Sequence, residues 1–392
     1  MDSFAIIVTG WFDGETNHSP VPTTILVEDG IIADIATGDH GDALAKRGAA
    51  VHRGGYLMPG LVDAHVHLFL DGAPTDGKAR SEHLKQPLER LTEAARQSAR
   101  QARAAGVTVV RDAGDRHGIN HRIRDEARRN PGTMPVVRSG GLGVKRPKRY
   151  GAFMATDVGE DGDIHASVTG LAADNDEIKL ILTGIIDFDA GAVTDEPQFS
   201  AEDARRVVDA ARSCGRNTFA HCSGVKGLTV AAEAGVGSIE HGFFMTREIL
   251  EIMAAKAIAW TPTFCPVHFQ WAHPEAVGWS APTVANLRRI LDDHAHHLVM
   301  AHRMGVPLLL GTDAGSMGVE HGAAVIDEIE RYVEAGMSLD ATLTAATASA
   351  RRHFGHPHPV LRKGAAFDAV LLAISPFDDI RTLRSPLGVW RQ

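Results

Sequence analysis

Short β-rich runs of hydrophobic residues occur near both ends of the chain, at residues 4–8, 23–27, 30–35 and 367–372. The Asp29-Gly30 pair between two of these runs is a hairpin turn signal. A Lys363-Gly364 turn precedes the last run. We therefore expect residues 1–57 and residues 364–392 to pair into one small β-sandwich module.

Between these ends, apolar runs alternate with amphipathic stretches rich in alanine, arginine and glutamate. Eight runs are strand candidates, at residues 62–67, 107–113, 134–140, 177–184, 217–222, 238–241, 258–263 and 306–313. Helical stretches intervene, for example at 88–105, 201–214, 247–256 and 286–304. This alternation, with strands apolar on both faces, predicts an α/β fold with a closed (β/α)8 TIM barrel over residues 58–363. An open doubly wound sheet is the alternative, but no glycine-rich phosphate loop follows an early strand.

Composition and charge narrow the class of protein. The 392 residues fit one large barrel plus a smaller module, and a 44% hydrophobic composition is that of an ordinary globular enzyme. The net charge of −9 argues against a nucleic-acid surface. The one basic cluster, residues 145–149, is either a solvated loop or a cationic rim for an anionic substrate.

The expected compartment is the cytoplasm. Three cysteines form no disulfide framework, and neither a signal peptide nor an apolar stretch of about 20 residues is evident. We therefore expect a small-molecule substrate as the partner, with no nucleic acid and no membrane.

Candidate metal ligands occur where the expected strands end. His65 and His67 are two residues apart, so in an extended strand their imidazoles project from one face, which suits two ligands of one divalent metal. Later strands add four candidates, Lys179, His221, His241 and Asp313. Active sites of such barrels lie at the carboxyl ends of the strands, so we expect the six residues to converge on one rim. Each residue alone has an ordinary structural explanation, but their joint occurrence favours a metal centre.

With these motifs the chain resembles the metal-dependent amidohydrolase superfamily, most closely the branch of imidazolonepropionase-like hydrolases and Xaa-Pro (prolidase-type) dipeptidases. The resemblance covers essentially the whole chain and rests on the motifs at 25–30, 58–67, 106–112, 239–242, 311–313, 334–337 and 345–347. It implies a metal-dependent hydrolase of an amide or peptide-type C–N bond in a small molecule.

The resemblance also implies a binuclear metal centre. In the pattern of the family, His65, His67, Lys179 and Asp313 hold one divalent ion, and the histidines at 221 and 241 hold the other together with Lys179. Lys179 is then carboxylated by carbon dioxide and bridges both ions, which fits an apolar strand because burial lowers the pKa of an amine. The ligands suit zinc, with manganese, cobalt or iron as alternatives. In that pattern two bound ions would supply an acidic water, and Asp313 would take its proton and pass it to the leaving nitrogen.

One departure from the family pattern concerns the substrate pocket. Prolidase-type relatives carry His-Ala-Tyr after the fifth strand, whereas this chain has His221-Cys222-Ser223 and lacks the aromatic hydroxyl, which puts dipeptidase activity in doubt. The ring-rich loop 263–271 and the loop 140–150 are expected to line the pocket. The candidate pocket residues are Ser223, His268 and Tyr150.

Two other functions stay open beside the binuclear hydrolase. The first is a mononuclear-metal deaminase, or a hydrolase of a cyclic amide or imide, acting on a ring C–N bond. Deaminase-like members generally lack the lysine of the fourth strand, so Lys179 favours the binuclear hydrolase. The second is a non-catalytic scaffold, but such proteins tend to lose ligands. Family members often form dimers or larger assemblies, so a homo-oligomer is also an option.

Overall fold

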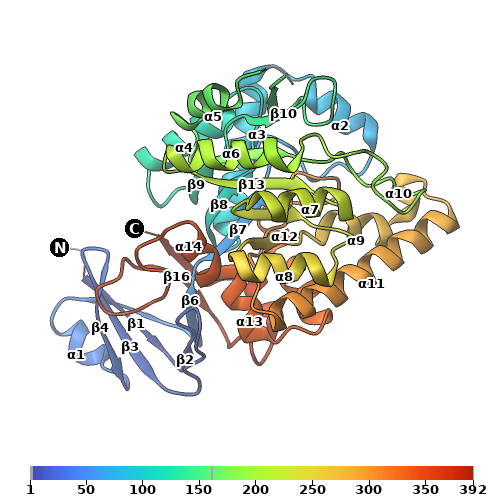
Figure 1. Ribbon diagram of the computed structural model, residues 1–392. Helices are drawn as coiled ribbons and strands as arrows, with labels where there is room; N and C mark the ends of the chain where they lie inside the picture. The colour runs from blue at the N-terminus through green and yellow to red at the C-terminus, as the bar shows by residue number, and fades with distance from the viewer. Residues whose placement is uncertain (1–2, 160–161, 392) are drawn as a thin grey trace.

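The computed structural model describes residues 3–159 and 162–391, and it has a mixed α/β fold (Figure 1). Residues 1, 2 and 392, which belong to the expected chain-end module, lie outside the described part. Strands from the two ends of the chain form two four-stranded sheets, of which the second contains both C-terminal strands. Their strands are β1 (Ser3–Val8), β2 (Gly10–Trp11), β3 (Thr23–Glu28), β4 (Ile31–Thr37), β5 (Ala50–Arg53), β6 (Tyr56–Pro59), β16 (Asp368–Leu372) and β17 (Gly388–Arg391).

The second of these sheets joins the two ends of the chain. The strand orders are β4-β3-β1-β5 and β17-β16-β6-β2, and β16 runs antiparallel to β6 with Val370 opposite Met58. In Figure 1 the red strand β16 lies beside the blue strand β6. One hydrophobic cluster joins the two sheets, with Ile6 and Ile25 from the first and Leu57 and Leu371 from the second. Strand β6 runs across position 57/58, where the expected module and the expected barrel meet.

The strands of the larger part are parallel and largely buried, as their apolar runs require. They form a three-stranded sheet, β7-β8-β9, and a six-stranded sheet of order β11-β10-β12-β13-β14-β15. Their bounds are β7 (Leu61–Val66), β8 (Val107–Asp112), β9 (Val136–Ser139), β10 (Gly143–Lys145), β11 (Ala155–Asp157), β12 (Glu177–Ile181), β13 (Asn217–Cys222), β14 (Ser238–His241) and β15 (Ala259–Thr261). The first seven barrel strands expected from the sequence correspond to β7, β8, β9 and β12 to β15.

The expectation of a regular eighth strand at 306–313 is wrong. Instead of a continuous ladder, isolated bridges join Leu308 to Trp260 of β15 and Ala314 to Val66 of β7. Leu310 N donates to the carbonyl of Ala345, in a π-helical turn, at 3.2 Å, and the backbone turns into the left-handed region at Asp313, with φ of 56°. Both features interrupt a regular ladder. The segment nevertheless lies between the two strands, because Leu309 N donates to β15 at 2.9 Å and Asp313 N donates to β7 at 2.8 Å.

Helices connect the strands. Ser200, Thr246 and Ser280 cap α6, α8 and α11 by accepting backbone N–H bonds. The helices are α1 (Gly41–Ala45), α2 (Gly77–Leu84), α3 (Leu88–Ala104), α4 (Ile119–Arg129), α5 (Ile164–Ala172), α6 (Ala201–Ser213), α7 (Val225–Ala234), α8 (Arg247–Lys256), α9 (Cys265–Ala272), α10 (Pro274–Val277), α11 (Ala281–Arg303), α12 (Ala323–Glu334), α13 (Leu339–Thr344) and α14 (Ala350–His353), with a π-helical turn at Ala345–Ser349 and a 3₁₀ helix at Ile380–Arg384.

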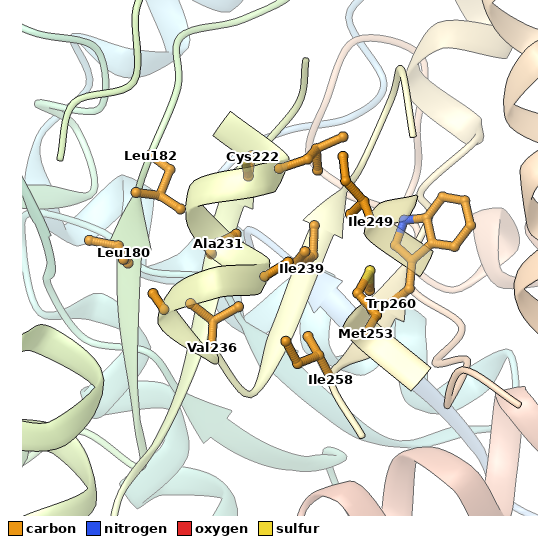
Figure 2. Packing of buried hydrophobic residues seen from close by; sticks show 14 of the residues in the cluster. Leu180, Leu182, Cys222, Ala231, Val236, Ile239, Ile249, Met253, Ile258 and Trp260 are labelled. Atoms are coloured by element: carbon orange, nitrogen blue, oxygen red, sulfur yellow. The ribbon is translucent and has the colours of Figure 1, made fainter. Parts of the chain in front are cut away.

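The main hydrophobic core lies between the six-stranded sheet and its helices. Leu180 and Ile239 extend from β12 and β14, and Ala231 and Met253 meet them from α7 and α8 (Figure 2). Every labelled residue in that view is buried, so the sheet and its helices enclose a continuous apolar layer. None of the helices that the structure describes has the length and hydropathy that a bilayer crossing requires.

Candidate active site

Three side chains at the end of β7 and in the segment 306–314 form a tight group. The Nε2 atoms of His65 and His67 each lie 3.7 Å from Asp313 Oδ1. One potential ligand atom from each residue lies within 4.8 Å of the other two, a spacing that suits one shared metal ion. Ser316 Oγ donates to Asp313 Oδ2 at 3.0 Å, which leaves Oδ1 directed at the imidazoles.

His221 and His241 extend this group from β13 and β14. The ring centroids of His221 and His241 are 4.6 Å apart, and those of His241 and His65 are 5.0 Å apart. Consecutive strand residues normally point to opposite faces. Here Glu240 and His241 both contact His65, because His241 has a left-handed backbone with φ of 66°. The backbone turn therefore brings two consecutive side chains into the site.

Left-handed backbone recurs at this edge of the sheet. Besides His241, Thr263 has φ of 53° and Asp313 has φ of 56°. A non-glycine residue in this region costs of order 1–3 kcal/mol, and such strain gathers at functional sites because the surrounding structure holds it in place. His241 ends β14, Thr263 follows β15 and Asp313 lies in the segment 306–314, so the strain at this edge supports its assignment as the candidate site.

Lys179 lies in β12, enclosed by apolar groups. The side chain has 0% exposure, and its Nζ lies 3.0 Å from Met154 Sδ and 5.8 Å from the ring centroid of Phe219. Burial lowers the pKa of the Lys179 amine to about 8, and the lysine charge in turn helps to lower the pKa of His65 and His67. Lys179 is therefore close to the histidine group, and its amine is much easier to deprotonate than that of an exposed lysine.

The histidines are oriented by partners on their Nδ1 atoms. His65 Nδ1 donates to Glu240 Oε2 at 2.7 Å, and His67 Nδ1 donates to the carbonyl of Gly114 at 3.2 Å. His241 Nδ1 lies 2.8 Å from Thr263 Oγ1. These contacts leave the Nε2 atoms free for a ligand, and burial keeps the rings neutral by lowering the pKa of all three.

The environment of His65 Nε2 shows whether a metal ion fits between His65, His67 and Asp313. This atom is buried and has no hydrogen-bond partner among the residues that the structure describes. An unpartnered buried nitrogen is costly unless something binds it. A divalent ion between His65, His67 and Asp313 would satisfy it, so the donor set fits a metal.

Sequence reasoning missed the residues that support this group. Glu240 has 0% exposure, and its Oε1 accepts from Arg111 Nη2 at 2.7 Å and from Ser238 Oγ at 2.5 Å. Arg111 is also fully buried and lies 3.7 Å from Glu177. The available signal was a charged residue inside an apolar strand, because such a residue must find a buried partner. For Glu240 the partners are Arg111, Ser238 and His65 of the histidine group.

A cavity of about 270 Å³ opens beside the histidine group. Two of the three pocket residues expected from the sequence, Tyr150 and Ser223, line it together with His67, His221 and Asp313. The remaining lining is largely apolar and includes Phe153, Met154, Ile185, Ile186, Phe188 and Phe243. The cavity suits a small molecule with a substantial apolar part.

The expectation that His268 lines this cavity is wrong. The ring-rich segment after the seventh strand is the helix α9 rather than a loop, and its two faces serve two cavities. Val267 and Gln270 face the histidine group, whereas His268 faces a second cavity and bonds to Arg331 at 2.6 Å. Helical periodicity places residues three apart on one face, so His268 cannot share the face of Val267.

The basic cluster at 145–149 does not form a cationic rim. Lys145 is ion-paired with Asp157 at 2.5 Å, and Arg146 is ion-paired with Asp203 at 2.6 Å. Arg149 donates to a backbone carbonyl, that of Glu196. Of the loop 140–150, only Tyr150 lines the cavity among the described residues.

The chain belongs to the amidohydrolase family, whose model matches residues 56–390. It is therefore an amidohydrolase, a hydrolase that acts on carbon–nitrogen bonds.

Two curated relatives are similar to the chain in sequence, and one solved structure is similar to it in fold. The chain is 27% identical to ochratoxinase of Aspergillus niger, with 96% of this chain and 82% of the relative covered. It is 24% identical to imidazolonepropionase of Saccharopolyspora erythraea, with 98% and 93% covered. A crystal structure of a Xaa-Pro dipeptidase with methionine bound in its active site shares the fold, with a TM-score of 0.82, 23% identity, and 99% and 98% of the chains covered. The resemblance inferred from the sequence motifs is confirmed.

Proposed function

We propose that this amidohydrolase cleaves an amide or peptide-type C–N bond in a small molecule, with two divalent metal ions as cofactors. The observation that carries the proposal is the convergence of four histidines, Lys179 and Asp313 beside one cavity. His65, His67 and Asp313 would hold one ion. His221 and His241 would hold the other, and a carboxylated Lys179 would bridge the two.

The donor set favours zinc, with manganese, cobalt or iron as alternatives, since neutral imidazole and carboxylate oxygen suit all four. Bound divalent ions would polarise the scissile carbonyl and make a water molecule acidic enough to act near neutral pH. Glu240, Gly114 and Thr263 contact the Nδ1 atoms of the imidazoles and so orient their Nε2 atoms for metal binding.

Asp313 is the proposed proton carrier. Its Oδ1 faces the two histidines, while Ser316 holds its Oδ2. Burial raises the pKa of Asp313 to about 6, so its carboxylate can take up a proton near neutral pH and release it to the leaving nitrogen. Asp313 also lines the cavity, where that nitrogen would lie.

We also propose that the parallel strands close into a (β/α)8 barrel and that the two chain-end sheets form a β-sandwich. Backbone bonds from the segment 306–314 to both β15 and β7 support closure on one side. On the other side, Asp176 N donates to Ser139 O at 2.9 Å, and β10 pairs with β12. The hydrophobic cluster shared by the chain-end sheets supports the sandwich.

The test is a comparison of the parent protein with Lys179→Met by elemental analysis and by ¹³C NMR after growth or exchange with labelled bicarbonate. We expect about two ions per parent chain and a carbamate signal, both reduced in the variant together with turnover. Propionate should restore part of the activity of a Lys179→Ala protein. Lys226→Met is the matched control, because Lys226 is exposed and its ion pair, with Glu196, lies on the surface.

The outcomes separate the candidate functions. A parent protein with one ion that Lys179→Met retains would favour the mononuclear deaminase or ring hydrolase. A Lys179→Met protein with two ions and full turnover would contradict the bridging role.

A further inference from the structure

Arg80, in α2, is the only lysine or arginine that lines the active-site cavity among the residues that the structure describes. Its Nη1 donates to the carbonyl of Asp71 at 3.2 Å, and its Nη2 donates to the carbonyl of Gly315 at 3.0 Å. Gly315 follows closely on Asp313, so these bonds hold the guanidinium beside the segment that carries the proposed proton carrier.

The guanidinium of Arg80 has no carboxylate directly bound to it among the residues that the structure describes. It forms no ion pair with any carboxylate that the structure describes, and its two hydrogen bonds go to neutral carbonyls. Some other half-buried arginines have such partners, since Arg96 pairs with Glu126 at 2.7 Å and Arg146 pairs with Asp203 at 2.6 Å. Arg103 and Arg391 also donate to carbonyls, but neither lines the cavity. Burial lowers the pKa of Arg80, although the charges of Asp313 and Asp71 act in the opposite direction, so the cost of burying this cation is only partly offset.

An anionic ligand would remove that cost. A guanidinium presents five N–H donors in a planar fork, and a carboxylate accepts two of them at once. The rest of the cavity is lined mainly by apolar side chains, such as Phe153, Ile185 and Phe188. A suitable ligand therefore has one carboxylate and one apolar part.

We propose that Arg80 binds a free carboxylate of the substrate and thereby selects N-acylated amino acids with apolar groups. This inference rests on the proposed C–N hydrolase function. In an N-acyl amino acid the carboxylate carbon is two bonds from the amide nitrogen. An anchor beside Gly315 therefore places that nitrogen near Asp313, which would return the proton to it.

The test compares two substrates that differ only in charge, N-benzoyl-leucine and N-benzoyl-leucinamide, by the release of benzoate from the metal-loaded enzyme. We expect the parent to favour the acid. Arg80→Met should lower kcat/KM for the acid by about 10- to 100-fold, the loss typical of one charged hydrogen-bond anchor, and leave the value for the amide within about two-fold. Arg80→Lys should recover part of the preference, since it keeps the charge but not the fork. Arg149→Met, in the basic cluster outside the cavity, should behave as the parent.

Equal losses for acid and amide in Arg80→Met would show that Arg80 only supports the loops at 71 and 315, and would overturn the proposal. A parent enzyme that does not prefer the acid would do the same. If the parent releases no benzoate from either compound, the proposed function fails on this class of amide, and calorimetric binding of the two compounds decides the role of Arg80. Binding of the acid alone, lost in Arg80→Met, supports it; equal binding overturns it.

Discussion

Replacement of Glu240 by glutamine tests how the protein prepares His65 for a metal. The carboxylate of Glu240 accepts on both oxygens, from His65 Nδ1 at 2.7 Å on one and from Arg111 at 2.7 Å and Ser238 on the other. A glutamine amide has only one acceptor oxygen. If that oxygen stays with Arg111, the NH2 group faces His65 and forces Nδ1 to accept, so the ring proton moves to Nε2, the atom directed at Asp313.

The size of the effect follows from these contacts. A partner that orients a metal-ligating histidine is typically worth about 10- to 100-fold in metal affinity, or roughly 1.4–2.8 kcal/mol. The variant also leaves the fully buried Arg111 with Glu177, at 3.7 Å, as its remaining charged partner. Breaking a buried ion pair costs about 3–5 kcal/mol, so the free energy of unfolding should fall by about 3 kcal/mol, because Glu177 compensates in part.

The assay is a competition titration of the metal-free proteins with a chromophoric chelator, together with urea unfolding. Glu251→Gln is the control, because Glu251 forms an exposed pair with Arg247 and should alter neither quantity. If a folded Glu240→Gln protein binds metal within about two-fold of the parent, then Glu240 does not set the tautomer of His65.

Two further predictions concern the proton carrier and the lysine. Asp313→Asn keeps the shape of the side chain but not its base, so kcat should fall about 10²–10⁴-fold while at least one metal stays bound; turnover within a few-fold of the parent would assign the proton to another residue. Dialysis against a strong chelator should abolish turnover, and zinc, manganese or cobalt with bicarbonate should restore it. Because burial lowers the pKa of Lys179 to about 8, the neutral amine that forms the carbamate becomes more abundant as the pH rises towards 8. Reconstitution should therefore accelerate up to that pH and level off above it, whereas a rate that stays flat from about pH 6 to about pH 9 would contradict this role of Lys179.

The parts of the fold that the sequence predicted are those with a local physical cause. Apolar strands such as 107–113 and 217–222 were recognisable because buried parallel strands are apolar on both faces. The histidines at 65 and 67 were recognisable because a strand fixes the direction of side chains two residues apart. Their approach to Asp313 then required only that parallel strands end at one edge.

Other features depend on contacts that no local pattern encodes. The apolar pattern of 306–313 predicts a strand. Leu310 N instead donates to the carbonyl of Ala345 in the π-helical turn, more than 30 residues away, and this bond interrupts the ladder. His268 was placed in the pocket because α9 was taken for a loop, and only the helical period separates its two faces. Arg80 lies in a polar helix that has no buried residue, so nothing in its sequence neighbourhood indicates the cavity.

The pairing of β6 with β16 has a consequence for how the protein is made. His65 and His67 leave the ribosome early. The strand before them, β6, pairs with Asp368–Leu372, which is made near the end of synthesis. Their own strand, β7, bonds to the segment 306–314, which is also made late. The nascent chain thus exposes the unpaired edges of these strands until nearly the whole polypeptide has emerged. Contacts so distant in sequence form slowly, and exposed strand edges invite wrong pairing in the meantime. The first-synthesised residues of the site are therefore among the last to gain all their strand neighbours.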